Sequence, residues 1–470
     1  MDIAIISAYL LAMILIGVYA AKRVSSASDL YVGGLNFGGV ATALSFFTTY
    51  FSSVIFVGAT AIGWKYGLLV LWKDVFVVFV GTLAAFIFIG PRLLAFSRRF
   101  GFSSIVEFIE VRYKTSLAGI IAALTTFVGL YIYTISALIG MARALEAMGL
   151  DYTMSLLISS ATTLLYIALG GYLAQVWTQS IQAVFMLAMA IAIAVTSLAS
   201  VGGIGNLQQR LSSIDPLLAS WPYRDLLPMF SFYLSLGFMG IGNPALVMKF
   251  ITARDRISLK LATVVATATV ATLTLSLDIA SATTRAIISS DSVKPDHAFI
   301  YLTKTLMPKG FDTLMIIAIL SASMSTISAL INTLTHTLRD VVKKLGSNLI
   351  GNTKRDVMFF RLTTATLAAT ATILALKPPE MLITLFGVTT AILSSTLVGP
   401  IIYGLYWRKA TAEGAIASMV TSFAIAIAVS AYGHFSFPWT YYAFVPALAA
   451  SLTVMPITNL VSKPARKQNC

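Results

Sequence analysis

The sequence predicts an all-α membrane protein with 13 transmembrane helices, in which two repeats of five helices are flanked by one extra N-terminal and two extra C-terminal helices. Three observations support this fold class. Only 11% of the 470 residues are charged, whereas a soluble domain averages about 25%. Apolar stretches of roughly 20 residues, the length that crosses a bilayer as a helix, recur along the whole chain. Two of these stretches are interrupted, and each of the two opens a block of five.

The expected spans divide the chain into five parts. Residues 1–25 hold the extra N-terminal span, 38–200 the first repeat, 227–410 the second repeat, 411–462 the last two spans and 463–470 a cytoplasmic tail. Because each repeat has an odd number of spans, the second repeat runs through the membrane in the opposite direction, as in LeuT-like 5+5 inverted-repeat folds. We place the spans at residues 3–21, 40–63, 68–91, 117–142, 152–169, 174–199, 227–248, 261–288, 311–337, 357–376, 380–406, 412–432 and 438–461.

The basic residues indicate the orientation of the spans. If the N-terminus is outside, the inner loops hold 22 of the 32 Lys and Arg residues. Such an excess is typical of cytoplasmic loops, so we expect a multi-pass protein of the cell membrane with its N-terminus outside and its C-terminus in the cytoplasm. The same asymmetry accounts for most of the net charge of +14. Nucleic acid is therefore not an expected partner.

The two interruptions predict a transporter. Thr-Thr-Tyr-Phe-Ser-Ser interrupts the first stretch at residues 48–53, and Gly-Phe-Met-Gly-Ile-Gly-Asn-Pro interrupts the second at residues 237–244. Broken helices at corresponding positions of two halves are the best sequence pointer to the binding site of a secondary transporter, near the middle of the bilayer. No nucleophile elbow, phosphate loop or metal-ligand cluster occurs in the sequence, so we do not expect an enzyme.

The span at 311–337 carries a polar stripe that runs from the middle of the membrane to the inner surface. Its polar side chains recur at helical spacing and comprise Ser321, Ser325, Ser328, Asn332, Thr335 and Arg339. Packing between helices through small residues is one interpretation of this stripe. The adjacent hydroxyls of Ser325 and Thr326 favour ion binding, because a small hard cation such as Na⁺ takes about five or six oxygen ligands. Carbonyls freed at a broken helix, here around residues 48–51, can supply others.

Four motifs resemble the sodium:solute symporter family, which contains the sodium/proline, sodium/pantothenate and sodium/glucose symporters. They are residues 170–182, Gly-Asn-Pro at 242–244 with Lys-Phe at 249–250, Met-Ser-Thr at 324–326 with Arg-Asp at 339–340, and residues 399–415. The resemblance covers nearly the whole chain. It implies Na⁺ as the coupling ion, bound by the carbonyls of Thr48, Phe51 and Ala322 and by the hydroxyls of Ser325 and Thr326.

The chain departs from this family at three places. Proline-type members have an Asp where this chain has Tyr50, and many members have an Asp where it has Gln179. The sugar-type members have polar residues at the positions of Val54 and Ile55, which argues against a sugar as the solute. The five oxygens that remain form a neutral site, and weak Na⁺ binding is what a coupled carrier needs.

Asp278 is an ionisable residue inside an expected span. A carboxylate at the centre of a transmembrane helix costs about 2.5–3.5 kcal/mol on insertion scales, so it suggests a function. It is either a protonatable coupling group or a residue that hydrogen-bonds neighbouring hydroxyls or lies in an outer vestibule. Arg285 is about 10.5 Å farther along the helix, too far for a direct ion pair. We assign a possible ion path to Gln179, Asp278, Ser321 and Ser328.

These patterns together predict Na⁺-coupled symport of a small organic solute by alternating access. We expect no Lys or Arg at mid-depth, so a carboxylate on the solute would meet backbone N–H groups and half-helix N-termini. Proline, another neutral amino acid or a short monocarboxylate fits this description of the solute.

The expected partners are this solute, Na⁺ and the lipid bilayer, with no obligate protein partner. The alternatives are a proton-coupled or uncoupled carrier on the same fold, and a transporter-like membrane sensor. The expected substrate residues are Phe47, Tyr50, Ser53, Val54, Phe238, Gly240, Asn243 and Phe386.

The predicted orientation can be tested with Cys470, the single cysteine of the chain. We predict that a membrane-impermeant thiol reagent leaves Cys470 unlabelled in intact cells and labels it after permeabilisation, because the tail is cytoplasmic. As a control, Asn206→Cys in a Cys470→Ser background lies in an expected outer loop and is labelled in intact cells. Labelling of Cys470 without permeabilisation would show that the orientation is wrong.

Overall fold

The computed structural model describes residues 2–146, 149–219, 226–288, 295–308, 310–346, 350–378, 382–436 and 438–461. The regular elements in this part of the chain are helices, and one isolated bridge joins Phe37 and Ala253. The elements of the first half are α1 (Asp2–Ala21), α2 (Ala27–Val32), η1 (Gly33–Leu35), α3 (Gly39–Tyr50), η2 (Val54–Ala59), α4 (Thr60–Tyr66), η3 (Gly67–Leu71), α5 (Trp72–Val75), η4 (Phe76–Ile89), α6 (Gly90–Phe100), α7 (Ile105–Tyr113), α8 (Ser116–Glu146), α9 (Tyr152–Val201), α10 (Ile204–Ile214) and η5 (Pro216–Leu218). Those of the second half are α11 (Leu226–Gly242), α12 (Pro244–Thr252), α13 (Arg256–Ile287), α14 (Pro295–Leu306), α15 (Phe311–Lys344), α16 (Thr353–Ala375), α17 (Leu382–Tyr406), α18 (Ala412–Tyr432), α19 (Trp439–Tyr442) and α20 (Phe444–Val461). The expected tail at 463–470, with Cys470, lies outside the described residues.

The described residues contain 11 helical runs that are long and apolar enough to cross a membrane, compared with the 13 spans expected. Two runs, Val54–Phe100 with 47 residues and Tyr152–Val201 with 50 residues, are each much longer than one crossing, which takes roughly 20 residues. These are the places where the sequence divides the chain into more spans. The all-helical membrane fold is confirmed, while the count of 13 stays a prediction.

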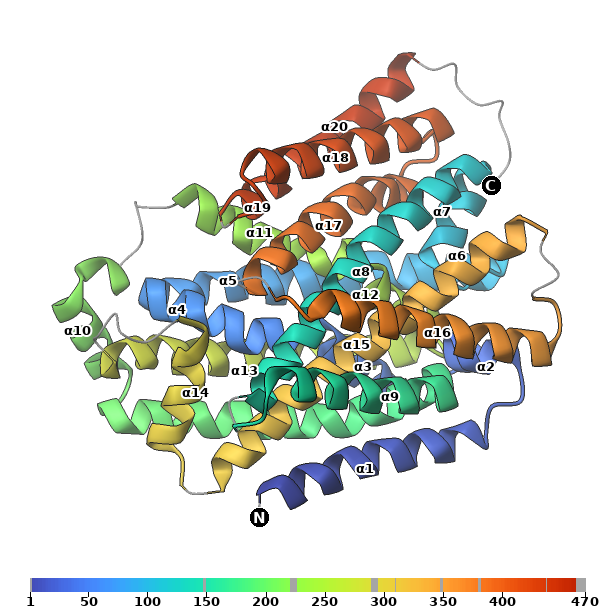
Figure 1. Ribbon diagram of the computed structural model, residues 1–470. Coiled ribbons are helices and arrows are strands. Elements are labelled where there is room, and N and C mark those ends of the chain that lie inside the picture. The colour runs from blue at the N-terminus through green and yellow to red at the C-terminus, as the bar shows by residue number, and fades with distance from the viewer. Residues whose placement is uncertain are drawn as a thin grey trace.

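Helix α15 lies at the centre of the bundle, and the helices expected as additions lie outside it (Figure 1). In α15, 94% of the most apolar window is buried inside the protein, compared with 33% in α1 and 39% in α18. Helix α1 packs along α9 on one side, whereas α18 and α20 pack on each other and on α17 on the other side (Figure 1). This arrangement fits the predicted flanking helices, and the repeat boundaries themselves stay a prediction.

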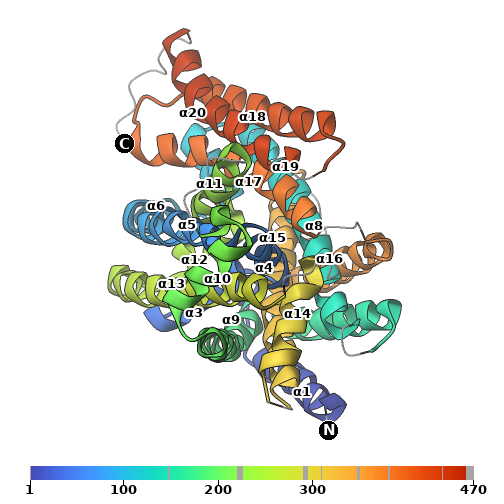
Figure 2. The ribbon, with the colours of Figure 1, turned by 90° about the vertical axis from the view of Figure 1, so that its left-hand side faces the viewer.

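The connecting segments gather at two ends of the bundle. Helices α10 and α14 lie in the connections after the expected spans 174–199 and 261–288, which the expected orientation places outside. Both helices lie at the same end of the bundle and face the viewer in Figure 2. Helices α2 and α6 lie at the opposite end (Figure 1). Helix α2 begins with a capping box between Ser26 and Asp29. Partial burial raises the pKa of the Asp29 carboxyl, but hydrogen bonds from Ser25 and Ser26 outweigh it and hold the pKa below its usual value.

Both interruptions seen in the sequence are breaks in the structure. Helix α3 ends at Tyr50, Phe51 is extended with φ −103° and ψ 104°, and helical structure resumes at Val54. Helix α11 ends at Gly242, and Asn243 (φ −85°, ψ 115°) separates it from α12. Pro244 at the first position of α12 explains this second break, because the residue before a proline is pushed out of helical geometry.

The long run α9 doubles back at Gly171. This residue has φ 55° and ψ −143° inside the run. Tyr166, before it, and Gln179, after it, bond to the carbonyls of the adjacent residues Met324 and Ser325 in α15. In a continuous helix the two side chains would be separated by about 19.5 Å along the axis. The chain therefore reverses at Gly171, and α9 supplies two antiparallel arms that both contact α15.

We predict that Gly171→Ala destabilises the fold strongly. A non-glycine residue in a sparsely populated backbone region costs about 1–3 kcal/mol, and a Cβ here would also lie 2.7 Å from the carbonyl oxygen of Leu30. Thermal unfolding of the detergent-purified protein measures the loss. Gly101→Ala is the control, because Gly101 also has positive φ (72°) but no atom within 4 Å of an added Cβ. Equal melting temperatures for the two variants would contradict the role of Gly171 as the point of reversal.

Candidate functional site

Four oxygen atoms from α3 and α15 meet where α3 ends. The hydroxyl of Ser325 lies 2.9 Å from the carbonyl oxygens of both Thr48 and Ala322. The hydroxyl of Thr326 lies 3.3 Å from the same Thr48 carbonyl. All four residues are fully buried. The structure thus brings together four of the five oxygens that the sequence assigns to a Na⁺ site.

The break in α3 explains why these carbonyls face another helix. The last four carbonyls of a helix have no partner within it, and the N–H of Phe51 makes the final bond of α3, to the carbonyl of Phe47. The carbonyl of Thr48 is the next along the chain and binds the α15 hydroxyls instead. Phe51 lies directly after the end of α3, and the role of its carbonyl as a Na⁺ ligand stays a prediction.

Gln179 of α9 holds α3 and α15 together beside the four oxygens. Its Oε1 accepts a hydrogen bond from the hydroxyl of Ser45, and its Nε2 donates to the hydroxyl of Thr49 at 3.0 Å and to the carbonyl of Ser325 at 2.8 Å. A carboxylate accepts hydrogen bonds but donates none, whereas an amide does both. The neutral residue at this position is therefore matched to its surroundings.

Elsewhere in the α15 polar stripe, Ser321 and Asn332 contact other helices, whereas Ser328 bonds within α15. The hydroxyl of Ser321 lies 2.8 Å from that of Tyr9 in α1, and the hydroxyl of Ser328 donates to the carbonyl of Ser325 at 2.8 Å. Toward the end of α15, the amide of Asn332 donates to the carbonyl of Leu30 at 3.3 Å. Interhelical packing accounts for the contacts of Ser321 and Asn332, and a role of Ser321 and Ser328 in an ion path stays a prediction.

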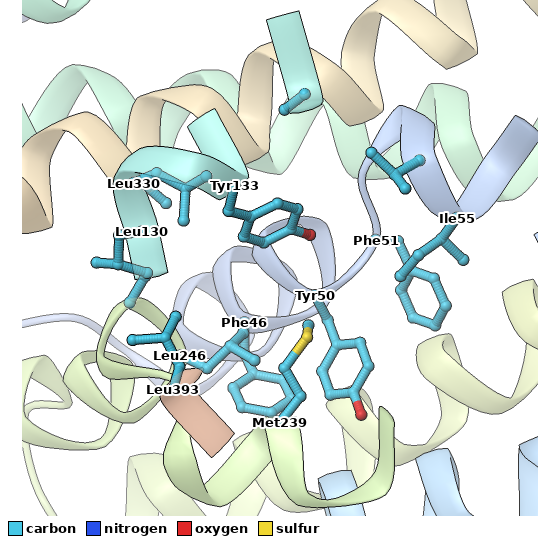
Figure 3. Packing of buried hydrophobic residues seen from close by; sticks show 14 of the residues in the cluster. Phe46, Tyr50, Phe51, Ile55, Leu130, Tyr133, Met239, Leu246, Leu330 and Leu393 are labelled. Carbon is cyan, nitrogen blue, oxygen red and sulfur yellow. The ribbon is translucent and has the colours of Figure 1, made fainter. Parts of the chain in front are cut away.

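The two broken helices touch through Tyr50. Its hydroxyl donates to the carbonyl of Leu236 in α11. Figure 3 shows Tyr50 beside Met239 of α11, with Tyr133 of α8 on the other side of the end of α3. The rings of Tyr50 and Phe51 lie 5.3 Å apart. The end of α3 therefore has the oxygen cluster toward α15 and an aromatic, largely apolar contact toward α11.

The other predicted substrate residues lie around this contact at different places. The ring of Phe386 lies 5.2 Å from that of Tyr133, and the hydroxyl of Ser53 lies 3.4 Å from the carbonyl of Ala137, so both residues contact α8. Phe47 and Val54 are fully buried beside the break. Phe238 lies 6.2 Å from Phe444 of α20 and Gly240 lies against Gly81 of η4. Their contact with a solute stays a prediction.

Asn243 presents an unused donor at the second break. Its Oδ1 accepts a hydrogen bond from the N–H of Ala245 at 3.0 Å and so caps α12. Its Nδ2 has no hydrogen-bond partner in the described part of the chain, although the residue is only 1% exposed. A buried donor without a partner is costly, and a bound acceptor would satisfy it.

Asp278 lies in a different charged cluster. Its Oδ2 is 2.8 Å from the Nζ of Lys73, which is also 3.0 Å from the Oδ1 of Asp74. The sequence analysis did not identify Lys73 as the partner. The adjacent pair Lys73-Asp74 inside the expected span 68–91 was the available signal, because an ionisable residue within a span is a functional candidate by default. Arg285 does not pair with Asp278 and instead lies 4.6 Å from the ring of Trp64.

Comparison with known proteins identifies similar chains. The model of the sodium:solute symporter family matches residues 30–422. The sodium/pantothenate symporter of Escherichia coli (strain K12) is 29% identical over 96% of this chain and 95% of its own length. The osmoregulated proline transporter OpuE of Bacillus subtilis (strain 168) is 26% identical over 98% and 94% of the two chains.

Solved structures share the fold. A Na⁺-coupled sialic acid symporter in a substrate-bound outward-open state superposes with a TM-score of 0.83 at 21% identity, over 99% of both chains. MHP1, a nucleobase-cation-symport-1 family transporter in a closed conformation, superposes with a TM-score of 0.52 at 15% identity, over 93% of this chain and 95% of its own. At these identities the likeness shows the fold alone.

We predict that Ser325→Ala and Thr326→Ala each raise the Na⁺ concentration that gives half-maximal uptake in proteoliposomes by roughly tenfold or more. An interaction with a charged group contributes about 1.5–3 kcal/mol, and 1.4 kcal/mol corresponds to a factor of ten. Thr326→Ser keeps a hydroxyl and should retain most of the Na⁺ affinity. Ser323→Ala is the matched control, because Ser323 is equally buried in α15 but its hydroxyl bonds to the carbonyl of Ile319 in its own helix. Unchanged Na⁺ dependence in both test variants would rule out the site.

Proposed function

Because this chain belongs to the sodium:solute symporter family, we propose that it takes up a small amphipathic carboxylate together with Na⁺ by alternating access. Na⁺ is the coupling ion. Proline, another neutral amino acid or a short monocarboxylate fits the solute site. The observation that carries this proposal is the cluster of four oxygens from Thr48, Ala322, Ser325 and Thr326, which joins the broken end of α3 to α15.

In this proposal Na⁺ lies among these oxygens and the carbonyl of Phe51. The hydroxyls of Ser325 and Thr326 bond to the Thr48 carbonyl in the structure. To coordinate a cation they turn their protons away, so that hydroxyl and carbonyl oxygens all present lone pairs to the ion. Na⁺ thereby replaces hydrogen bonds between α3 and α15 with ion contacts to the same atoms. A neutral ligand set of this kind suits a transported ion, which has to leave as well as enter.

The solute contacts the other side of the α3 end. The surroundings of Tyr50, with Phe46 at 5.8 Å and Met239 beside it, favour an apolar body (Figure 3). The unpartnered Nδ2 of Asn243 and the N-terminal end of α12 favour a carboxylate. The buried Lys73 is already held by Asp74 and Asp278, so it is not the group that receives the solute. The sequence analysis expected no Lys or Arg at mid-depth, and this stays a prediction. The bundle does bury Lys73 and Lys249, and the Nζ of Lys249 has no hydrogen-bond partner among the described residues.

The two ligands are coupled through residues 47–54. Na⁺ on the carbonyls of Thr48 and Phe51 orders the segment whose opposite side, around Tyr50, meets the solute. Ordering by one ligand lowers the conformational cost of binding the other, and the effect is reciprocal. Tyr50 also bonds to the carbonyl of Leu236 in α11, so a solute that binds at Tyr50 affects both broken helices. This link gives a route from binding to a rearrangement of the bundle.

The chain is a multi-pass membrane protein of a transporter family, and the relatives it matches are transporters. We add to the proposal an N-terminus outside, a cytoplasmic C-terminus and a location in the cell membrane, supported by the distribution of Lys and Arg. Its partners in this scheme are the solute, Na⁺ and the bilayer. Transport needs no enzymatic step and no second protein chain.

We predict that the solute binds more tightly in Na⁺ than in choline or K⁺, by a factor of about 5–150, the range of a typical coupling of 1–3 kcal/mol. The solute is first found by thermal-shift screening of the purified protein with L-proline, other neutral amino acids, pantothenate and short monocarboxylates, since a bound ligand raises stability by mass action. Calorimetric titration with the hit in each salt then gives the ratio.

The coupling test has a matched pair of variants. Thr326→Ala should bring the affinity ratio toward one, whereas Ser323→Ala should leave it at the wild-type value because its hydroxyl does not face the cluster. Equal solute affinities in Na⁺ and choline for the wild type would refute coupling at a shared break, and an uncoupled carrier would then be the better description.

A further inference from the structure

Lys73, Asp74 and Asp278 form a charged cluster away from the α3–α15 site. The Nζ of Lys73 lies 3.0 Å from Oδ1 of Asp74, 2.8 Å from Oδ2 of Asp278 and 2.7 Å from the hydroxyl of Thr274. The Thr274 hydroxyl donates to Oδ1 of Asp74. The side chains of Lys73, Asp74 and Asp278 are 2%, 6% and 1% exposed. Two helical segments, α5 and α13, are thus joined by buried charges inside the membrane-spanning part of the fold.

The charges of this cluster do not balance when every group is ionised. Two carboxylates face one ammonium, which leaves one negative charge. Among the described residues, Lys73 is the one cation within ion-pairing distance of either carboxylate. An uncompensated charge in a buried, low-dielectric site is very costly, and a pair of carboxylates that share a site cannot both stay ionised without compensation. The cluster therefore needs one further positive charge.

The free oxygen atoms show where that charge belongs. Oδ2 of Asp74 and Oδ1 of Asp278 have no hydrogen-bond partner in the described part of the chain. The two carboxyl groups contact the same Nζ of Lys73, at 3.0 and 2.8 Å, so they lie close to each other. Two free oxygens are far fewer than the five or six that a hard cation takes, and the ammonium of Lys73 already occupies the centre of the cluster. A single proton, which needs one donor oxygen and one acceptor, fits the remaining positions.

The other titratable groups around the cluster do not supply the missing charge. On α11, the hydroxyl of Tyr233 donates to the carbonyl of Leu69 at 2.8 Å, and a neutral phenol adds no charge. On α4, Lys65 lies over the ring of Tyr66 at 5.0 Å. On α13, Arg285 is two turns from Asp278 and lies over the ring of Trp64.

We propose that Lys73, Asp74 and Asp278 form a proton-binding site that holds one exchangeable proton, shared between the two carboxyl groups, in addition to the Na⁺ site. Protonation forms one O–H bond on Asp74 or Asp278 and makes the cluster neutral. The reverse step returns the proton to water when a rearrangement of α5 and α13 hydrates the carboxylates. External pH then shifts the balance between the closed and the hydrated arrangement.

Infrared spectroscopy of the detergent-purified full-length protein tests the site without Na⁺ or solute. A protonated carboxyl and a carboxylate absorb in separate regions, and the band of the protonated form shifts in heavy water. We expect the wild type to have a protonated-carboxyl band at neutral pH, where exposed acids are ionised, that disappears on alkaline titration. Asp74→Asn and Asp278→Asn should each lose this band, because the one remaining carboxylate balances Lys73. Lys73→Met should increase it about twofold, since both carboxyls then need protons.

The difference spectrum of wild type minus either Asn variant decides the result. Loss of a protonated-carboxyl band supports the proposal, whereas loss of a carboxylate band shows a permanently ionised structural cluster and overturns it. Asp151→Asn is the control, because Asp151 is an exposed N-cap of α9 whose removal should subtract only a carboxylate. Either Asn variant is sufficient, so failure of one to fold leaves the test complete.

Uptake gives a second readout. At a fixed Na⁺ gradient, wild type and Ser323→Ala should show pH-dependent uptake, whereas Asp278→Asn should transport with a flat pH profile and an unchanged Na⁺ concentration for half-maximal uptake. An Asp278→Asn variant that keeps the wild-type pH profile overturns the proton site and leaves Na⁺ coupling intact. If uptake by the wild type does not depend on Na⁺, the proposed function is contradicted, whereas the infrared evidence for the proton site is unaffected.

Discussion

The interrupted backbone of α3 is the constraint on which the site depends. A backbone carbonyl inside a membrane protein needs a partner, because lipid offers none. Where α3 stops at Tyr50, the Thr48 carbonyl finds its partners in the Ser325 and Thr326 hydroxyls of α15. The Thr48 carbonyl lacks a partner in its own helix. Its hydrogen bonds to α15 hold the two helices together and also gather oxygen atoms into a cluster. In the proposed function, the atoms that satisfy the backbone are therefore the same atoms that would bind the cation.

The surrounding helices stabilise this geometry with neutral groups. Gln179 both donates and accepts, which lets one side chain hold Ser45, Thr49 and the Ser325 carbonyl at once. Tyr50 uses its hydroxyl for the carbonyl of Leu236, so the two broken helices are tied together. By the resemblance described above, proline-type members have an Asp at the position of Tyr50, and many members have an Asp at the position of Gln179. Here the positions carry groups that complete hydrogen bonds without adding charge, and the oxygen cluster remains neutral.

Two buried carboxylates, those of Asp74 and Asp278, lie elsewhere, around Lys73. The cluster at α5 and α13 differs from the α3–α15 site in chemistry as well as in position. Hydroxyls and carbonyls at the first suit a weakly held Na⁺, whereas two carboxyls and an ammonium at the second leave room for one proton. The two sites are formed by different helices. A carrier of this construction can respond to the Na⁺ gradient and to pH through separate elements.

The sequence by itself determined the membrane-spanning helical fold, the two breaks and the residue types of the proposed Na⁺ site, because each is a local property. Span length and hydropathy follow from the bilayer, Pro244 ends a helix at its neighbour, and the Ser325-Thr326 pair shares one helical turn.

Only the tertiary structure decided which distant groups meet. Gly171 reverses α9, so that Tyr166 and Gln179 contact adjacent carbonyls of α15, and α5 brings Lys73 to Asp278 across about 200 residues of chain. No periodicity within one span encodes those contacts, since they depend on how helices pack against each other. For the same reason the sequence excluded Arg285 as the partner of Asp278 but could not identify Lys73 as the residue that takes its place.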